Sequence, residues 1–187
     1  MPISPKSQPS PPLPRVATGA NIRAKDSPAK NILLNYLLAA QRIYSLTDRT
    51  QKLIDYENGV EILLNAGANI YARDENGNSL LMIAADKGYL QTVDILLKNG
   101  LSGNEKNQKD LALLMAVGRN TYESREEIVR LLLKNGANPN FLIGDSDEYD
   151  AKCNSALISA AAAVDFKLAQ LLVENGADVN LTCKNGD

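Results

Sequence analysis

The acidic segment that begins at Asp145 comes closest, in residue types and spacing, to a metal-binding site. Asp145, Asp147 and Tyr149 match the first three ligand positions of a calcium-binding loop of the EF-hand kind. That loop requires glycine at its sixth position and glutamate at its twelfth. Here these positions hold Asp150 and Ala156. The segment is therefore interpreted as an exposed acidic loop, and no metal site is predicted.

Catalytic chemistry is limited by the absence of histidine, the commonest general base and a frequent zinc ligand. A serine or cysteine triad of the usual kind is thereby excluded. Cys153 and Cys183 cannot form a four-thiolate site, and free thiols are favoured over a disulfide. Gly77, Gly88 and Gly100 lie too far apart for a phosphate-binding loop. We predict no enzymatic activity, no catalytic residues and no cofactor.

Residues 1–26 are rich in proline and serine and are expected to form a disordered tail. Residues 11–15 (Pro-Pro-Leu-Pro-Arg) could bind a WW or SH3 domain as a polyproline II helix, but such short motifs are common in disordered tails, so a plain tail is favoured. The net charge of −2 gives no nucleic-acid signature, and no apolar run is long enough to span a membrane. Few cysteines favour an intracellular location. A monomer is expected.

Four glycines close similar apolar runs along the chain, at Gly67, Gly100, Gly136 and Gly176. They are separated by 33, 36 and 40 residues, as subtraction of their numbers shows. A period of this length indicates a protein built from stacked structural repeats. The glycines are expected to end helices, because glycine readily adopts the left-handed conformation found there.

The second unit shows the repeated pattern most clearly. A turn over 74–79 precedes a short helix over 80–87, and a tight turn at Gly88 precedes a longer helix over 90–99. The later units predict second helices over 128–135 and 166–175. Before these units, apolar residues three or four positions apart predict two helices, within 32–43 and 53–64.

These units resemble the ankyrin repeat family, whose unit is a β-turn followed by two antiparallel helices. The residues that match the family pattern in order are Asp74, Gly77, Leu81, Ala84, Ala85, Gly88, Val93, Leu96, Leu97 and Gly100, and residues 176–180 form an intact closing segment. The resemblance implies an all-α solenoid of stacked helix-turn-helix units joined by β-turn or hairpin loops. The family's Thr-Pro-Leu-His segment is replaced at residues 79–82, 111–114 and 155–158. We expect its turn-to-helix hydrogen bonds to be lost and the array to be only moderately stable.

The resemblance also divides the chain. Its expected parts are a tail over 1–26, an N-terminal helical cap with a degenerate first repeat over 27–59, and ankyrin repeats over 60–187. The units fall at about 29–73, 74–106, 107–149 and 150–182, with a truncated repeat at 183–187. Because solenoids need a polar terminal cap, we expect this to be the N-terminal piece of a longer protein. A naturally short chain that caps itself is the alternative.

Ankyrin arrays bind partners on a concave face lined by turn tips and first helices, which implies a protein-interaction module here. The residues expected on that face are Glu75, Asn76, Asn78, Asp86, Lys87, Asn107, Gln108, Asp110, Arg119, Tyr122, Tyr149, Lys152 and Asn154. The alternative is a substrate-recruiting or regulatory part of a larger enzyme. The divergent repeats also resemble ankyrin effectors that intracellular bacteria deliver into host cells, which would place the chain in host cytosol.

Overall fold

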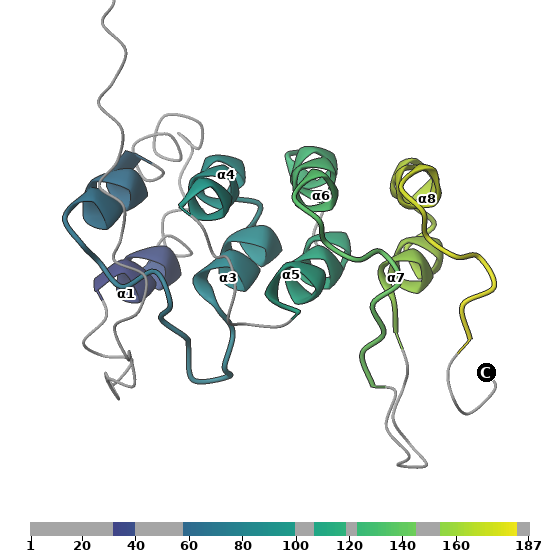
Figure 1. Ribbon diagram of the computed structural model, residues 1–187, viewed down its shortest axis with the longest axis horizontal. Coiled ribbons are helices and arrows are strands. Elements are labelled where there is room, and N and C mark those ends of the chain that lie inside the picture. The colour runs from purple at the N-terminus through teal and green to yellow at the C-terminus, as the bar shows by residue number, and fades with distance from the viewer. Residues whose placement is uncertain (1–31, 40–57, 100–106, 119–122, 145–153, 183–187) are drawn as a thin grey trace, which may run out of the picture.

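A computed structural model describes residues 32–39, 58–99, 107–118, 123–144 and 154–182. Its helices lie in two layers (Figure 1). The inner layer, from which the long loops extend, contains α1 (Ile32–Ala39), α3 (Leu80–Lys87), α5 (Gln108–Val117) and α7 (Ala156–Ala162). The outer layer contains the helical residues 58–65, α4 (Leu90–Lys98), α6 (Arg125–Lys134) and α8 (Phe166–Glu174). The predicted all-α repeat fold is confirmed.

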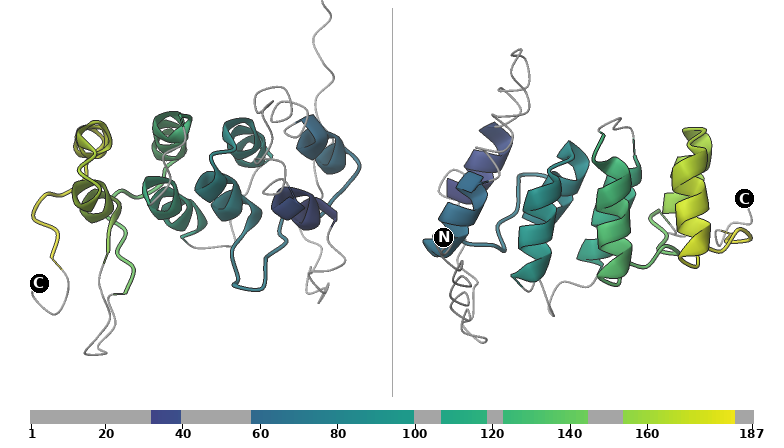
Figure 2. Two further views of the ribbon diagram at one scale, coloured as in Figure 1. Left: turned by 180° about the vertical axis from the view of Figure 1, so that it is seen from behind. Right: turned by 90° about the horizontal axis from the view of Figure 1, so that it is seen from above.

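Successive helix pairs stack along the long axis of the molecule, as the views from behind and from above show (Figure 2). Within the pairs α3–α4, α5–α6 and α7–α8 the inner helix packs against its outer partner, and α1, α3 and α5 each pack against the next inner helix. The packing is uneven, because α3 and α5 contact each other much more extensively than α5 and α7 do. The inner helices of the third and fourth units are therefore less closely joined than those of the second and third.

Two serines cap inner helices and correct one expectation from the sequence. Ser79 Oγ accepts a hydrogen bond from the Met82 N–H at 3.3 Å, and Ser155 Oγ accepts one from the Ile158 N–H at 3.2 Å. Serine accepts from the first turn of a helix as threonine does. The expected loss of hydrogen bonding between turn and helix is thus wrong for the second and fourth units, where serine occupies the threonine position.

Asparagine ends each long outer helix by the same contact. The Nδ2 groups of Asn99, Asn135 and Asn175 each donate to the carbonyl four residues earlier, all at 2.8 Å. The glycines that follow the last two, Gly136 and Gly176, have φ values of 86° and 90°. Asparagine therefore binds a carbonyl left open at the helix end, and glycine turns the chain away.

The turn between α7 and α8 contains a valine in a glycine conformation. Val164 has a φ of 56°, and it stands 76 residues after Gly88, whose φ is 76°. The next N–H in each turn donates to an inner-helix carbonyl at 3.0 Å, from Tyr89 to Ala84 and from Asp165 to Ala160. A β-branched residue is strained in this region, so the fourth unit keeps the turn at an energetic cost.

The core consists mainly of aliphatic side chains and small residues, together with the fully buried ring of Tyr89. Leucines and isoleucines fill it, and alanine occurs where inner helices meet, as at Ala84 and Ala160, which are both fully buried. Small side chains allow close approach of neighbouring helices. Their neighbours differ, because Ala85 is buried while Ala161 is exposed.

Gly59 lies inside the helical residues 58–65 without interrupting them. A Cβ atom at this position would lie 2.0 Å from Tyr36 Oη and 2.6 Å from Tyr36 Cζ. Glycine lowers helix propensity, but here it lets the outer helix approach the Tyr36 ring on α1. The first unit is held by this contact as well as by its leucines.

Several sequence-based predictions concern parts of the chain outside the described residues. These are the tail over 1–26, the acidic loop over 145–150, the closing segment over 183–187 and both cysteines. The helix pairs α3–α4, α5–α6 and α7–α8 fall within the expected units 74–106, 107–149 and 150–182. The unit boundaries themselves stay predictions.

Candidate protein-binding surface

The loop before α3 is organised around one carboxylate. Asp74 Oδ1 accepts from the backbone N–H groups of Asn76 and Asn78, at 2.9 and 2.8 Å, and Asp74 Oδ2 accepts from Asn78 Nδ2 at 2.9 Å. Gly77 has a φ of 81° and its carbonyl accepts from the Arg73 guanidinium. These contacts fix a tight turn and leave Glu75 and Asn76 exposed at its tip.

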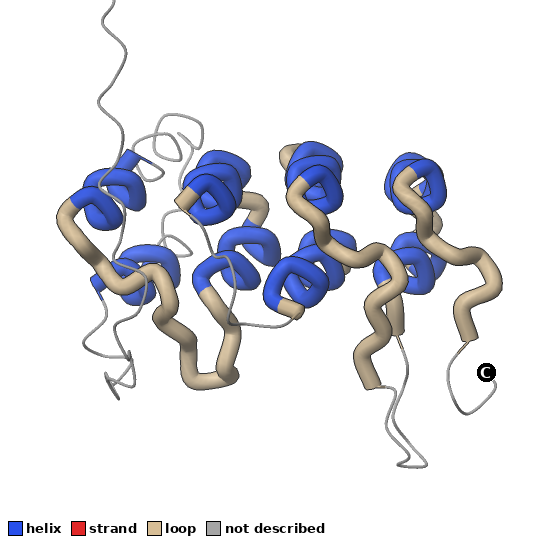
Figure 3. Tube along the Cα trace, viewed as in Figure 1, coloured by secondary structure: helices blue, strands red, loops and turns tan. Residues whose placement is uncertain are grey.

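The loops of different units extend on the same side of the inner layer. Residues 66–79 and residues 139–144 both run away from the outer helices (Figure 3). Each loop has a short paired base, formed by an antiparallel bridge from Arg73 to Ser79 and by another from Ile143 to Asn154. The loop before α3 and the described part of the loop before α7 therefore extend on one side of the molecule.

Asn154 forms part of the base of its loop. Its backbone pairs with that of Ile143 in both directions, at 3.0 and 2.9 Å, and Ser159 Oγ donates to Asn154 Oδ1 at 3.0 Å. The side chain of Asn154 is half-buried. Asn154 therefore has a clear structural task in holding the loop onto α7.

The start of α5 departs from the predicted surface. The sequence predicts Gln108 on the binding face, but it is the first residue of α5 and is only 6% exposed. Its buried side chain offers little surface to a partner, and its role in binding stays a prediction. Asn107 before it is exposed, with a φ of 76°. Asp110 Oδ1 accepts from the Asn138 N–H at 2.6 Å, so this carboxylate ties α5 to the loop after α6.

The remaining predicted residues fall into two groups. Asp86 and Lys87 form an ion pair with 2.8 Å between Asp86 Oδ2 and Lys87 Nζ, and both are half-buried at the end of α3. The second group lies outside the described residues and consists of Arg119, Tyr122, Tyr149 and Lys152. The role of these four residues in binding stays a prediction. Glu75, Asn76 and Asn107 are thus the predicted residues that the structure leaves exposed.

Polar contacts between units were missed by sequence reasoning. The Arg125 guanidinium pairs with the Asp165 carboxylate, joining the starts of α6 and α8, and both side chains are mostly buried. Ser124 Oγ donates to Gly88 O at 2.7 Å, and Asn140 contacts the closing loop of the fourth unit. The signal available in the sequence was the place of these residues in their units: Ser124, Arg125 and Asp165 stand at the starts of second helices, and Asn140 follows a closing glycine.

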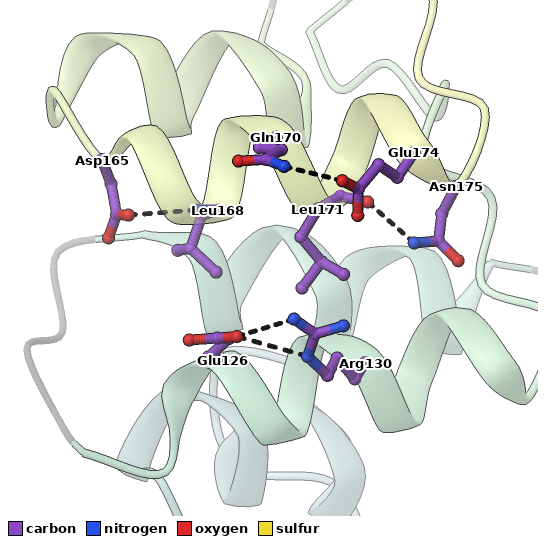
Figure 4. Close-up of polar contacts among 8 residues, drawn as sticks. All are labelled: Glu126, Arg130, Asp165, Leu168, Gln170, Leu171, Glu174 and Asn175. Carbon is purple, nitrogen blue, oxygen red and sulfur yellow. Dashed lines mark hydrogen bonds and ion pairs between the residues drawn. The ribbon is translucent and has the colours of Figure 1, made fainter.

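The outer layer satisfies many of its polar side chains within single helices. On α6, Arg130 Nη2 and Nε donate to Glu126 Oε1 at 2.8 and 3.3 Å, and on α8 Gln170 Nε2 donates to Glu174 Oε1 at 2.8 Å (Figure 4). Asp165 Oδ1 accepts from the Leu168 N–H at 3.1 Å and caps α8. These pairs join residues three or four apart on one helix, the usual arrangement of a solvated helix surface.

Other kinds of site find no support in the described part of the chain. No group of three or more His, Cys, Asp or Glu side chains gathers there as a metal ion would require. None of the helices described has both the length and the apolar composition needed to cross a lipid bilayer.

Helix pairs that stack in two layers and carry loops on one side define a helical repeat protein. The family model for ankyrin repeats (three copies) matches residues 52–143. The chain belongs to the ankyrin repeat family.

Comparison with known proteins finds relatives that are much longer than this chain. The potassium channel AKT2/3 of Arabidopsis thaliana is 31% identical over 173 residues, which cover 89% of this chain and 20% of the channel. Alpha-latrotoxin-Lg1a of Latrodectus geometricus is 33% identical over 64% of this chain and 8% of the toxin. The B-cell lymphoma 3 protein homolog of Mus musculus is 28% identical over 83% of this chain and 37% of its own length.

Proposed function

We propose that the chain binds a partner protein through its loop side, meaning the exposed loop residues Glu75 and Asn76 together with Asn107 at the start of α5. Ankyrin repeats are in general protein–protein interaction modules. The exposed groups of this loop side are one carboxylate and two amides, which suit a partner surface that offers several hydrogen-bond donors and at least one cation.

The observation that carries the proposal is the fixed conformation of the loop before α3. Three hydrogen bonds to Asp74 hold the turn, while its two tip residues remain exposed. A surface that is already ordered loses little conformational entropy on binding, so its contacts contribute more fully to affinity. The outer helices offer a weaker candidate, because pairs such as Glu126 with Arg130 are already engaged.

The role proposed is that of a non-enzymatic scaffold or adaptor. The alternative, a recruiting part of a larger protein, is favoured by the relatives, of which the aligned segments make up between 8% and 37%. A scaffold and a recruiting part would both bind through the loop side. They would differ in whether the remainder of the protein acts on the bound partner. That the chain is an effector delivered by an intracellular bacterium stays a prediction, which rests on its divergent repeats.

Affinity capture with two matched variants tests the proposal. The loop variant is Glu75→Arg/Asn76→Arg, and the control is Glu127→Arg/Gln170→Arg on exposed outer-helix positions, with the same change in net charge. Both are used as bait in extracts of cells that express the protein, after far-UV circular dichroism has shown that both fold. We expect the loop variant to lose the main captured protein and the control to retain it. Retention by both variants, or loss in the control alone, would overturn the loop side as the binding surface.

A further inference from the structure

Several asparagines of this chain are followed directly by glycine. Both residues of such a pair lie in the described part of the chain at Asn58–Gly59, Asn76–Gly77, Asn135–Gly136 and Asn175–Gly176. In these pairs the glycine nitrogen can attack the side-chain amide carbon of the asparagine, because glycine has no Cβ atom to hinder the approach. The asparagine side chain must first rotate towards that nitrogen. Contacts that hold the side chain elsewhere therefore oppose the reaction.

The two pairs at the ends of outer helices hold the asparagine side chain away from the glycine. Asn135 Nδ2 and Asn175 Nδ2 each donate to the carbonyl four residues earlier, at 2.8 Å. The backbone carbonyl of Asn135 also accepts from Lys109 Nζ at 2.9 Å. Both side chains thus point back along their helices, and reaction at either residue requires a hydrogen bond of the fold to break.

The pair in the first unit is held by packing. Asn58 begins the helical residues 58–65, and Gly59 lies so close to α1 that an added Cβ atom would be 2.6 Å from Tyr36 Cζ. Reaction at Asn58 would have to open the first turn of this helix beside the Tyr36 ring. The fold therefore opposes the reaction at three of the four described pairs.

Asn76 differs from the other three in the freedom of its side chain. It is exposed at the tip of the loop before α3, and its side chain makes no hydrogen bond with the described residues. The backbone around it is held, because the N–H of Asn76 donates to Asp74 Oδ1 at 2.9 Å and the N–H of Gly77 donates to Asp74 O at 3.1 Å. The turn therefore keeps the glycine nitrogen next to a side chain that can rotate towards it.

We propose that Asn76 is a site of spontaneous deamidation, by which the loop tip before α3 gains a carboxylate. The Gly77 nitrogen loses its proton to hydroxide and bonds to Asn76 Cγ, while the Cγ–Nδ2 bond breaks and ammonia leaves. The product is a five-membered succinimide. Water then opens this ring at either carbonyl, adding OH to the carbonyl carbon and a proton to the nitrogen. Opening at Cγ gives aspartate, and opening at the backbone carbonyl gives isoaspartate, whose main chain continues through Cβ and Cγ.

Both products change the loop side. Each places a new carboxylate next to the exposed Glu75 and close to Asp74, so that like charges repel one another. Isoaspartate also lengthens the main chain before Gly77, which displaces the Asn78 N–H from the Asp74 carboxylate that it contacts at 2.8 Å. The reacted tip is more negative and its turn is less fixed. Any effect on a partner rests on the proposed function, whereas the modification itself does not.

Incubation of the purified full chain tests the proposal without a partner. The folded chain and the same chain unfolded in guanidinium chloride are kept at mildly acidic and at mildly alkaline pH. Deamidation at each asparagine–glycine pair is followed over time by peptide mapping and mass spectrometry, with fragmentation that distinguishes isoaspartate from aspartate. The control variant is Asn76→Gln, whose longer side chain would have to close a larger ring and which keeps the other three pairs unchanged.

We expect position 76 of the folded chain to deamidate at least about fivefold faster than positions 58, 135 and 175, the factor by which one hydrogen bond of ordinary strength would slow a reaction that must break it. The rate should be higher at alkaline pH, because the Gly77 nitrogen must lose its proton. In guanidinium chloride the four rates should converge. Equal rates in the folded chain, or a difference that persists after unfolding, would overturn the proposal. This readout is chemical, so its failure is distinguishable from a failure of partner capture.

Discussion

Asn140 Oδ1 accepts a 2.7 Å hydrogen bond from the backbone N–H of Asp178, and thereby joins the closing loops of two successive units. Its amide group donates to the Gly176 carbonyl at 2.9 Å, so both ends of the side chain are used. This contact lies between the third and fourth units, where the inner helices pack less extensively than α3 and α5 do. The two hydrogen bonds of Asn140 therefore add a polar contact to the attachment of the last unit.

Replacement of Asn140 tests this contribution. Asn140→Ala removes two hydrogen bonds and leaves a donor and an acceptor of the fourth unit dependent on water, for a loss of about 1–2 kcal/mol in the free energy of unfolding. The measurement is urea denaturation followed by circular dichroism. The matched control is Asn180→Ala, which stands at the equivalent exposed position and should change stability by less than about 0.5 kcal/mol. Equal losses for the two variants would contradict the assigned role of Asn140.

The ion pair between Arg125 and Asp165 gives a second prediction. Asp165→Asn keeps an oxygen that can cap α8 but removes the charge that pairs with Arg125, and should cost up to about 1 kcal/mol, given that both side chains are mostly buried. In the Arg125→Gln background the same substitution should cost less, because the partner charge is gone. A double-mutant cycle by denaturant unfolding measures this coupling. Additive effects would show that the pair contributes nothing.

Val164 provides a prediction of increased stability. Val164→Gly relieves a left-handed conformation that costs an L-residue about 1–2 kcal/mol, while the added freedom of the unfolded chain takes back about 0.5–1 kcal/mol. The expected net gain is roughly 0.5–1 kcal/mol in the free energy of unfolding. Val164→Ala serves as the control, because it keeps the Cβ atom and most of the strain. A gain in the alanine variant as large as in the glycine variant would point to the exposed valine side chain, rather than its φ, as the cause.

The contact between Gly59 and Tyr36 predicts a steric effect in the first unit. Gly59→Ala places a methyl group where the Tyr36 ring lies, and should cost about 1–3 kcal/mol despite the better helix propensity of alanine. Thermal or urea unfolding measures the loss. In the Tyr36→Ala background the same substitution should be neutral or stabilising, since the obstruction is removed. A cost that persists without the ring would exclude the contact as its source.

The regular part of this fold could be predicted from the sequence because its signals are local. Gly136 and Gly176 end helices with positive φ as their spacing indicated, and the predicted helix over 80–87 has the same bounds as α3. The strained backbone at Val164 could also be predicted, because alignment of the second and fourth units places this valine at the position of Gly88. Local backbone chemistry of this kind needs no knowledge of the neighbouring units.

The candidate surface was less predictable because it depends on contacts between segments far apart in sequence. Gln108 is expected on the binding face from the unit pattern, but it begins α5 and its side chain is buried. Asp110 looked like a free carboxylate until its contact with Asn138, 28 residues later, was seen. The family pattern gives the place of a residue in a unit, and the packing of the units decides which side chains remain exposed.

Site-specific photo-crosslinking tests the central claim, that the loop side binds the partner, most directly. A photoreactive amino acid is placed at Asn76 on the loop tip in one chain and at Glu127 on the outer helix α6 in another, both exposed positions. After irradiation in cells that express the protein, covalent adducts are identified by mass spectrometry. We predict one recurrent protein adduct from position 76 that is absent or much weaker from position 127. The same adducts from both positions, or a recurrent adduct from position 127 alone, would contradict the claim.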